Sequence, residues 1–237
     1  MITIGLDDTD IKDTRGTNAI ARELLNRLDL QGRGSRIVRH QLLDDPRVPY
    51  TSRNGSASIV VEKADRSDIP WLIRDLKKWL LEWFIEGSDP GLCVTDHVPD
   101  EIVAFGKRCK VELIEQSEAR ELAAKHDIYL EGLGGTNQGI IGALASIGLI
   151  STGDDGRLVH LGGWPWPDEI HGGLIDAKTI YERGVDEIRV QATGEVLRDG
   201  RVDIVKNLRP NIRGGKIVLL VEATPDGRAP WKALKPT

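Results

Sequence analysis

The junction between the first apolar run and a group of three aspartates constrains the fold of this chain more than any other feature. Residues 2–6 are Ile-Thr-Ile-Gly-Leu, and Asp7, Asp8 and Asp10 follow at once. The apolar run predicts a buried first strand. Two ionised carboxylates about 5 Å apart repel each other by roughly 3 kcal/mol at an effective dielectric constant of about 20. We therefore expect a positive partner at the end of this strand.

A helix is predicted directly after the aspartates. Ile20, Leu24 and Leu28 are spaced four residues apart, behind Thr17 or Asn18 as the cap. The aspartates therefore lie on a turn between a strand and a helix. In open α/β sheets, ligands collect just beyond the carboxyl ends of the strands, so we expect a functional site on this turn.

The three aspartates have the chemistry of a magnesium site. Mg²⁺ takes one or two carboxylates and fills its remaining positions with water and nucleotide phosphates. In an extended segment Asp8 and Asp10 point to one side and Asp7 to the other. We expect all three to be metal ligands, with Asp7 either a second ligand or the group that orients the nucleophile. The alternative is an Asx-rich turn that caps the next helix.

The residues just before the helix have the composition of an anion site. Gly16 and Thr17 lie where free backbone N–H groups meet a helix N-terminus, which favours phosphate. Arg15 could stabilise the charge that develops on a transferred phosphoryl group. We therefore include Arg15 among the candidate catalytic residues, and Gly16 and Thr17 among the cofactor-binding ones.

Residues 132–148 form a glycine-rich segment, and the later part of this segment predicts a helix of small residues. Gly134, Gly135 and Gly139 are candidates for backbone contacts to phosphate. The segment is not a P-loop, because no Gly-Lys-Ser/Thr ends it. The alternative is a flexible turn followed by tight helix packing through Gly142 and Gly148.

Two further loops are candidates for substrate contacts. The polar loop at 48–58 contains Arg53 and Asn54, which we expect either to bind cofactor or to form a turn. The loop at 160–173 is dense in Trp, Pro and His, and aromatic rings beside carboxylates suit a cation that carries apolar carbon. Its candidate substrate residues are Trp164, Trp166, Asp168 and Glu169.

The chain is predicted to form two domains of mixed α/β class. Residues 68–86 predict a helix with Asp68 as its cap and Gly87 as its stop. We place the domain boundary between residues 128 and 129. Residues 1–128 predict an α/β domain, and 129–237 combine one or two helices with four short strands, which suggests an α+β domain of the ferredoxin-like kind.

Composition narrows the class of protein. The chain has 237 residues, 40% of them hydrophobic, which is enough for a substantial core. No apolar run is long enough to span a membrane, and we expect a cytoplasmic protein with no membrane partner. Cys93 and Cys109 are expected to be reduced thiols in or near the core. The net charge of −5 disfavours a surface that coats nucleic acid as a whole, although 198–235 is locally basic.

Several of these stretches, in order, resemble the ATP-dependent agmatidine synthetases, which modify the anticodon cytidine of a minor archaeal isoleucine tRNA. The similar stretches are the Asp-Asp-Thr-Asp turn, the "VPY…R…NG" loop, "DPG" at 89–91 and "GIIGALASIG" at 139–148. The resemblance implies an N-terminal kinase-like domain that binds ATP and Mg²⁺, then a ferredoxin-like domain that contributes to the agmatine site. The OB-fold and zinc ribbon with which the family grips tRNA are expected to be absent.

The function that follows is an ATP- and Mg²⁺-dependent ligase. It would phosphorylate an acceptor, such as a cytidine of a tRNA, and join it to an amine such as agmatine. The family has a phosphate-accepting threonine at a position where this chain has Ala19. Two alternatives therefore stay open: a small-molecule kinase or ligase that does not act on RNA, and a nucleotide- or RNA-binding module without turnover.

Overall fold

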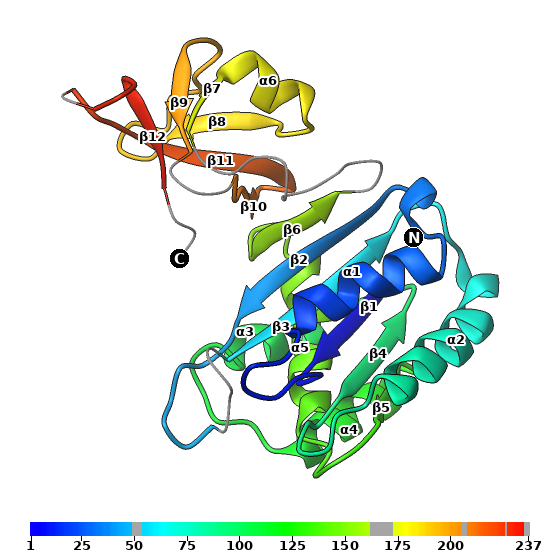
Figure 1. Cartoon of the computed structure of the whole chain (residues 1–237). Helices are drawn as coiled ribbons and strands as arrows, with labels where there is room; N and C mark the ends of the chain where they lie inside the picture. The colour runs from blue at the N-terminus through cyan, green and yellow to red at the C-terminus, as the bar shows by residue number, and fades with distance from the viewer. Residues whose placement is uncertain (49–53, 162–172, 205–207, 226, 235–237) are drawn as a thin grey trace.

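The computed structural model of the chain describes residues 1–48, 54–161, 173–204, 208–225 and 227–234 (Figure 1). Its twelve strands form one sheet, in the order β5-β4-β1-β3-β2-β6-β10-β11-β12-β9-β7, with β8 paired to β11. In the described ranges, no helix is both long and apolar enough to cross a membrane. Cys93 and Cys109 are free and buried, as expected.

The first elements along the chain form a split β-α-β unit. They are β1 (Ile2–Asp7), α1 (Thr17–Arg27), β2 (Ser35–Gln41), β3 (Gly55–Val61), α2 (Ile69–Glu82) and β4 (Gly91–Thr95). The strand order β4-β1-β3-β2, with every pair antiparallel, is the ferredoxin-like arrangement. That arrangement was expected at 129–237 and is found at 2–95. A kinase-like domain followed by a ferredoxin-like one is therefore not confirmed, whereas the mixed α/β class is.

The next elements extend this sheet and cover its second face. They are α3 (Asp100–Arg108), α4 (Gln116–Lys125), β5 (Tyr129–Gly132), α5 (Gly139–Ser151) and β6 (Arg157–Leu161). β5 pairs with β4, and β6 pairs with β2. The boundary placed between 128 and 129 stays a prediction, but β5, α5 and β6 all pack with elements that precede it.

Two layers of helices enclose the first six strands. Leu24 of α1 and Leu72 of α2 pack in one buried cluster with Ile4 of β1. On the other face, Phe105 of α3 packs with Leu144 of α5. Figure 1 shows α1 and α2 in front of the sheet and α3 and α5 behind it.

Helix α5 is the central element of the second layer. Eleven of its 13 residues are buried, as expected for a helix that is apolar on all sides. Glycines allow its close approach to the sheet: a Cβ on Gly5 would lie 2.0 Å from the Ala143 carbonyl oxygen. A Cβ on Gly148 would lie 2.0 Å from the Ile102 carbonyl oxygen. The packing alternative is therefore confirmed for Gly148.

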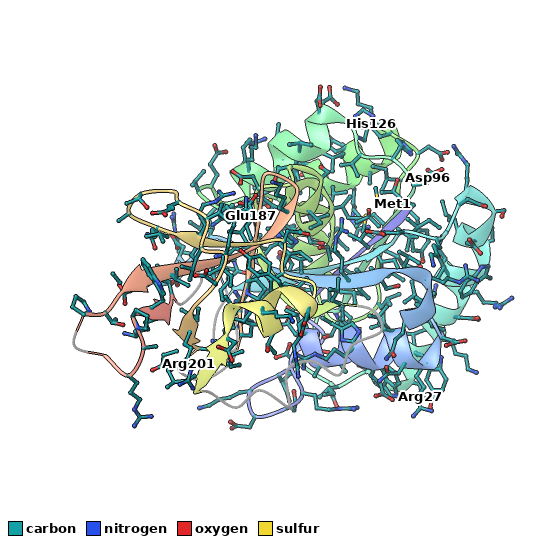
Figure 2. The ribbon with its side chains drawn as sticks, turned by 90° about the horizontal axis from the view of Figure 1, so that it is seen from above. Met1, Arg27, Asp96, His126, Glu187 and Arg201 are labelled. Carbon is teal, nitrogen blue, oxygen red and sulfur yellow. The ribbon has the colours of Figure 1, made fainter. Side chains whose placement is uncertain are left out.

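The last elements form a smaller body. They are β7 (Leu174–Asp176), α6 (Ala177–Glu182), β8 (Glu187–Val190), β9 (Arg201–Asp203), β10 (Asn211–Arg213), β11 (Lys216–Ala223) and β12 (Trp231–Ala233). This body has a buried cluster that includes Ile180, Ile188 and Leu219. It joins the first sheet where β10 pairs with β6. Seen from above, Glu187 and Arg201 lie on this body, on the opposite side of the molecule from Asp96 and His126 (Figure 2).

Candidate functional site

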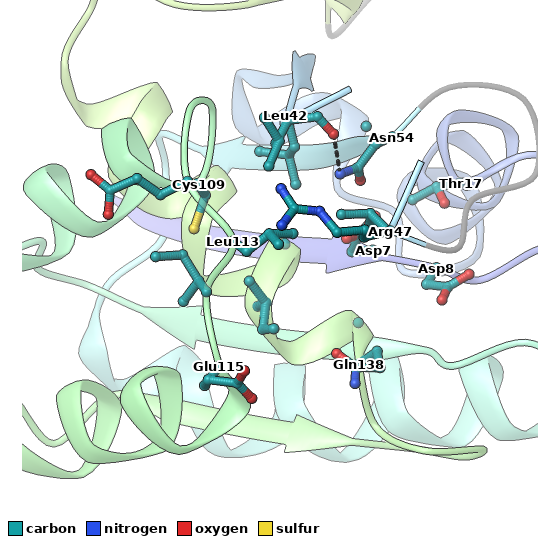
Figure 3. Close-up of a pocket in the computed structure, with 18 of the residues that line it drawn as sticks. Asp7, Asp8, Thr17, Leu42, Arg47, Asn54, Cys109, Leu113, Glu115 and Gln138 are labelled. Carbon is teal, nitrogen blue, oxygen red and sulfur yellow. Dashed lines mark hydrogen bonds between the residues drawn. The ribbon is translucent and has the colours of Figure 1, made fainter. Parts of the chain in front are cut away.

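The aspartate turn opens into a pocket of about 310 Å³. The pocket lies where β1 and β2 end and β3 begins, against the first turn of α5. The site thus forms where strand ends of both directions meet, because β1 is antiparallel to both of its neighbours. Figure 3 shows Asp7 and Asp8 at one end of the pocket and Cys109 and Glu115 at the other. These two ends differ in chemistry: the first is acidic and the second is largely apolar.

The pocket brings together many of the side chains that the sequence singled out. All three aspartates line it, and so do three of the residues expected to bind cofactor: Thr17, Asn54 and Gly139. Asn54 comes from the start of β3, and its Nδ2 donates a hydrogen bond to the Leu43 carbonyl oxygen (2.8 Å). The structure therefore brings these residues, which come from distant parts of the sequence, together along one pocket.

Other expected site residues lie elsewhere. Arg15 is exposed, and neither it nor Gly16 is among the described residues that line the pocket. A Cβ on Gly134 would lie 2.2 Å from the Phe84 ring, and one on Gly135 would lie 1.7 Å from Asp89 Oδ1. The structure thus gives both glycines a packing role. Five further candidates lie outside the described residues: Arg53, Trp164, Trp166, Asp168 and Glu169.

Asp7 is a half-buried carboxylate at the end of β1. It lies against α5, where a Cβ on Gly142 would come within 1.7 Å of Asp7 Oδ2. Gly142 is therefore needed for close packing here, as the alternative for this segment proposed. Burial, followed by the charge of Asp8, raises the pKa of Asp7 to about 7.

Asp8 is held in an unusual backbone conformation. Its φ is +49°, in the left-handed region where few residues other than Gly, Asn and Asp are found. Burial, and then the charges of Asp89 and Asp10, raise the pKa of Asp8 to about 6. Two neighbouring carboxylates whose pKa values are raised by burial and by nearby negative charges form a site that a bound cation would stabilise.

Asp10 has a second role that the sequence offered only as an alternative. Its Oδ1 accepts hydrogen bonds from the Thr17 backbone N–H (3.0 Å) and from Thr17 Oγ1 (3.1 Å). Thr9 Oγ1 donates in turn to Thr17 Oγ1 (3.2 Å). Asp10 therefore caps α1 and also lines the pocket. This bonding fixes the aspartate turn against the helix N-terminus.

Asp89 is a fourth carboxylate near the aspartate turn, and the sequence patterns do not identify it as a site residue. Its backbone N–H donates to the Asp8 carbonyl oxygen (3.1 Å), and its Oδ2 accepts from Thr136 Oγ1 (2.7 Å). It thereby joins the aspartate turn to the glycine-rich loop before α5. The only signal in the sequence is the Asp89-Pro90-Gly91 triplet, which marks a turn but does not reveal which loop it meets.

The far end of the pocket is largely apolar. Leu42, Leu43 and Val48 follow β2, and Leu113 and Ile114 come from the segment between α3 and α4. Glu112 adds negative charge at this end. Arg47, which is paired with Asp45 at 2.8 Å, also lines the pocket. An apolar wall beside a few convergent polar groups is the usual composition of a small-molecule site.

The described ranges contain no group of three His, Cys, Asp or Glu side chains that could hold a metal ion. A preformed all-protein cage is therefore not present in this part of the chain. Mg²⁺ does not require one, because it commonly binds one or two carboxylates and completes its shell with water and phosphate. Asp8 and Asp10 supply oxygens of the required kind. Burial, followed by the charges of Asp89 and Asp10, raises the pKa of Asp8, and a cation there would favour its ionised form.

The raised pKa of Asp7 predicts a stability that depends on pH. The folded state binds this proton more tightly than the unfolded state, so the stability that Asp7 contributes falls as pH rises from about 4 to about 7. We expect Asp7→Asn to be more stable than the wild type at pH 8 without Mg²⁺, by on the order of 2 kcal/mol. The gain should vanish near pH 4. Urea unfolding at both values checks this, and an equal gain at both would contradict it.

Comparison with known proteins supports the fold. No protein-family model and no curated protein matches the chain. Among solved structures, 62% of the chain aligns with a tRNA fluorescent labeling enzyme at 25% identity and a TM-score of 0.51, covering 35% of that protein. The same share aligns with TiaS in complex with tRNA(Ile2) and ATP, at 24% identity and a TM-score of 0.53, covering 36% of that protein.

The fold and the acidic pocket define a mixed α/β protein with a candidate ligand site on its first strand turn. Over the aligned part, the fold is like that of TiaS, a tRNA(Ile2) agmatidine synthetase. The resemblance found in the sequence is confirmed at this level. The chain spans about a third of the length of these proteins.

Proposed function

We propose that this chain is an ATP- and Mg²⁺-dependent ligase that activates an acceptor by phosphorylation and then joins it to an amine. The observation that carries the proposal is the crowding of Asp7, Asp8 and Asp10 along one pocket, with raised pKa values on the first two. Carboxylates that are crowded and partly buried repel one another, and binding a cation and its phosphate ligand would relieve that repulsion and give them a function.

Asp8 and Asp10 are the residues that would hold Mg²⁺, whose contribution would be to neutralise phosphate charge. Asp7 lies at the end of β1 against Gly142 of α5, where it would orient the attacking group. A carboxyl group with a pKa of about 7 can accept a proton at neutral pH, which suits it to that task.

The two ends of the pocket match the two ends of a nucleotide. The triphosphate would lie at the acidic end, where Thr17 begins α1 and the helix N-terminus favours anions. The base would lie against the apolar wall of Leu42, Leu43 and Ile114. Arg15, beside this helix start, is proposed to stabilise the transferred phosphoryl group.

The acceptor and the amine are proposed from the structural neighbour. TiaS was crystallised with tRNA(Ile2) and ATP, and a cytidine of a tRNA with agmatine would be the matching pair here. The acceptor oxygen would take the phosphoryl group from ATP and leave ADP. The amine nitrogen would then bond to the carbon that carries this oxygen and lose a proton, while the carbon–oxygen bond breaks and the oxygen leaves as part of phosphate. A metabolite acceptor is the alternative.

We expect ATP turnover with Mg²⁺ to rise when agmatine and bulk tRNA are both present. The test incubates purified protein with each mixture, identifies the phosphate released and measures whether any RNA gains mass. Turnover stimulated only by tRNA and amine supports the ligase. ATP binding without turnover in any mixture would contradict it and favour a binding module.

A further inference from the structure

A row of buried polar side chains lies behind the pocket, on the face of the sheet that α5 covers. His40 of β2 is fully buried, and its Nδ1 lies 2.8 Å from Asp155 Oδ1. Its Nε2 lies 2.9 Å from Ser58 Oγ on β3. The order Ser-His-Asp is that of a nucleophilic triad. Ser58 and His40 have no exposed surface, however, so no substrate can reach the hydroxyl and the role of the row is not hydrolysis.

The row continues to a lysine beside the pocket. Lys110 Nζ donates to Asp155 Oδ2, so both carboxylate oxygens of Asp155 are bonded. Lys110 follows Cys109, whose carbonyl oxygen accepts a hydrogen bond from the Leu43 backbone N–H (3.0 Å). Removing Lys110 or Asp155 would break this part-buried contact and release the chain after α3 from one of its two attachments. The chain just after α3 is therefore fixed from two sides.

This fixed point is the start of one wall of the pocket. The segment 109–115 contributes five lining residues: Cys109, Glu112, Leu113, Ile114 and Glu115. Beyond Cys109 it buries little of its own surface, since Val111 is 72% and Leu113 46% exposed. A segment with few buried contacts opens easily unless it is anchored. Figure 3 shows Cys109 and Leu113 on this segment, across the pocket from Asp7.

The neighbouring aspartate holds a different part of the molecule. Asp154 Oδ1 accepts from the Gly214 backbone N–H (3.2 Å), and the Asp154 carbonyl oxygen accepts from Arg213 Nη1 (3.0 Å). Asp154 thus binds the β10–β11 hairpin, while Asp155 binds the pocket wall. The two carboxylates offer a matched pair of variants within one turn.

We propose that the row formed by Ser58, His40, Asp155 and Lys110 is a positioning device that holds the 109–115 wall in its ligand-binding place. Asp155 and Lys110 are positioning residues, because they act through the wall and do not line the pocket. The identity of the ligand as ATP rests on the proposed function. The proposal that this row anchors the wall does not depend on the identity of the ligand.

Thiol labelling tests the anchoring without any assumption about the reaction. Cys109 lies in the wall and is 4% exposed, whereas Cys93 lies in β4 and is 0% exposed. The full chain is treated with N-ethylmaleimide, and both peptides are followed by mass spectrometry. We expect Lys110→Met and Asp155→Asn to speed labelling of Cys109 by about tenfold or more, while Cys93 stays protected.

Three controls sharpen the test. Asp154→Asn should leave the labelling rates of Cys109 and Cys93 unchanged. Lys107→Met should also leave them unchanged, because Lys107 is an exposed lysine on α3. Lys110→Arg should keep the labelling of Cys109 slow, as in the wild type. Unchanged labelling of Cys109 in Lys110→Met would overturn the proposal. A parallel rise at Cys93 would also overturn it, because it would indicate global destabilisation.

A kinetic measurement connects the wall to the pocket. If the proposed function holds, Lys110→Met should raise KM for ATP by about fivefold or more and leave kcat within about twofold, since the wall binds ligand but carries no reacting group. A fall in kcat alone would contradict the positioning role. Absence of turnover in the wild type would refute the proposed function, and the labelling comparison would still decide the role of the wall.

Discussion

Replacing Asp8 with alanine is expected to abolish Mg²⁺-dependent nucleotide turnover while the protein stays folded. The side chain lies in the acidic end of the pocket, between the charges of Asp10 and Asp89, where the proposed cation would bind. Loss of a metal ligand in a phosphoryl-transfer site should lower kcat by roughly a thousandfold or more. The measurement is phosphate release from ATP across a Mg²⁺ titration.

The choice of substitution matters because Asp8 has a φ of +49°. Asn tolerates this region and Ala does not, so Asp8→Asn removes the charge with less backbone strain. We expect Asp8→Asn to be as inactive as Asp8→Ala and at least as stable as the wild type at pH 8. The matched control is Glu86→Ala, an exposed carboxylate in the loop after α2. Full turnover in Asp8→Asn would show that the metal assignment is wrong.

Replacing Gly5 with alanine is expected to destabilise the whole fold. A Cβ at this position would lie 2.0 Å from the Ala143 carbonyl oxygen and 2.7 Å from Ser146 Oγ. The first of these atoms is backbone in the middle of α5, so the helix would have to move off the sheet. Overpacking of this kind costs about 1–3 kcal/mol and sometimes more, and we expect the upper end. Thermal and urea unfolding measure it.

Gly32→Ala is the control for Gly5→Ala. Gly32 lies in the short 3₁₀ turn Gln31–Arg33, and an added Cβ there would meet no atom within 4 Å. We expect its stability to stay within about 0.5 kcal/mol of the wild type. Equal stability of the two variants would mean that α5 does not approach β1 as closely as described.

Much of the local structure was predictable from neighbouring residues. The first strand, the helix after it and the acidic turn between them follow from hydrophobic spacing, which depends on residues only a few positions apart. The expected cap was wrong: Gly16 is the N-cap of α1, and Thr17 is already helical. The helix expected at 68–86 is present as α2 (Ile69–Glu82) and ends earlier, with Trp83 as its C-cap. Strong periodicity locates an element better than it locates the element's end.

The strand order could not be obtained in the same way. The ferredoxin-like arrangement lies at 2–95, where a different domain was expected. It could not be predicted from local patterns, because β1 pairs with β3 and β4 through residues more than 50 positions apart in the sequence. Hydrophobic spacing indicates which face of a strand is buried but does not determine which other strands pair with it.

In the candidate site, too, the local sequence determined some features and long-range packing determined the others. The sequence by itself placed Asp7, Asp8 and Asp10 close together, because they lie within four consecutive positions of the chain. Only the tertiary structure decided what surrounds them: Asp89 from the start of β4, the wall at 109–115, and α5 pressed against β1 through glycine. These contacts arise when distant segments pack together, and that packing depends on shape and burial across the whole molecule, which no local pattern contains.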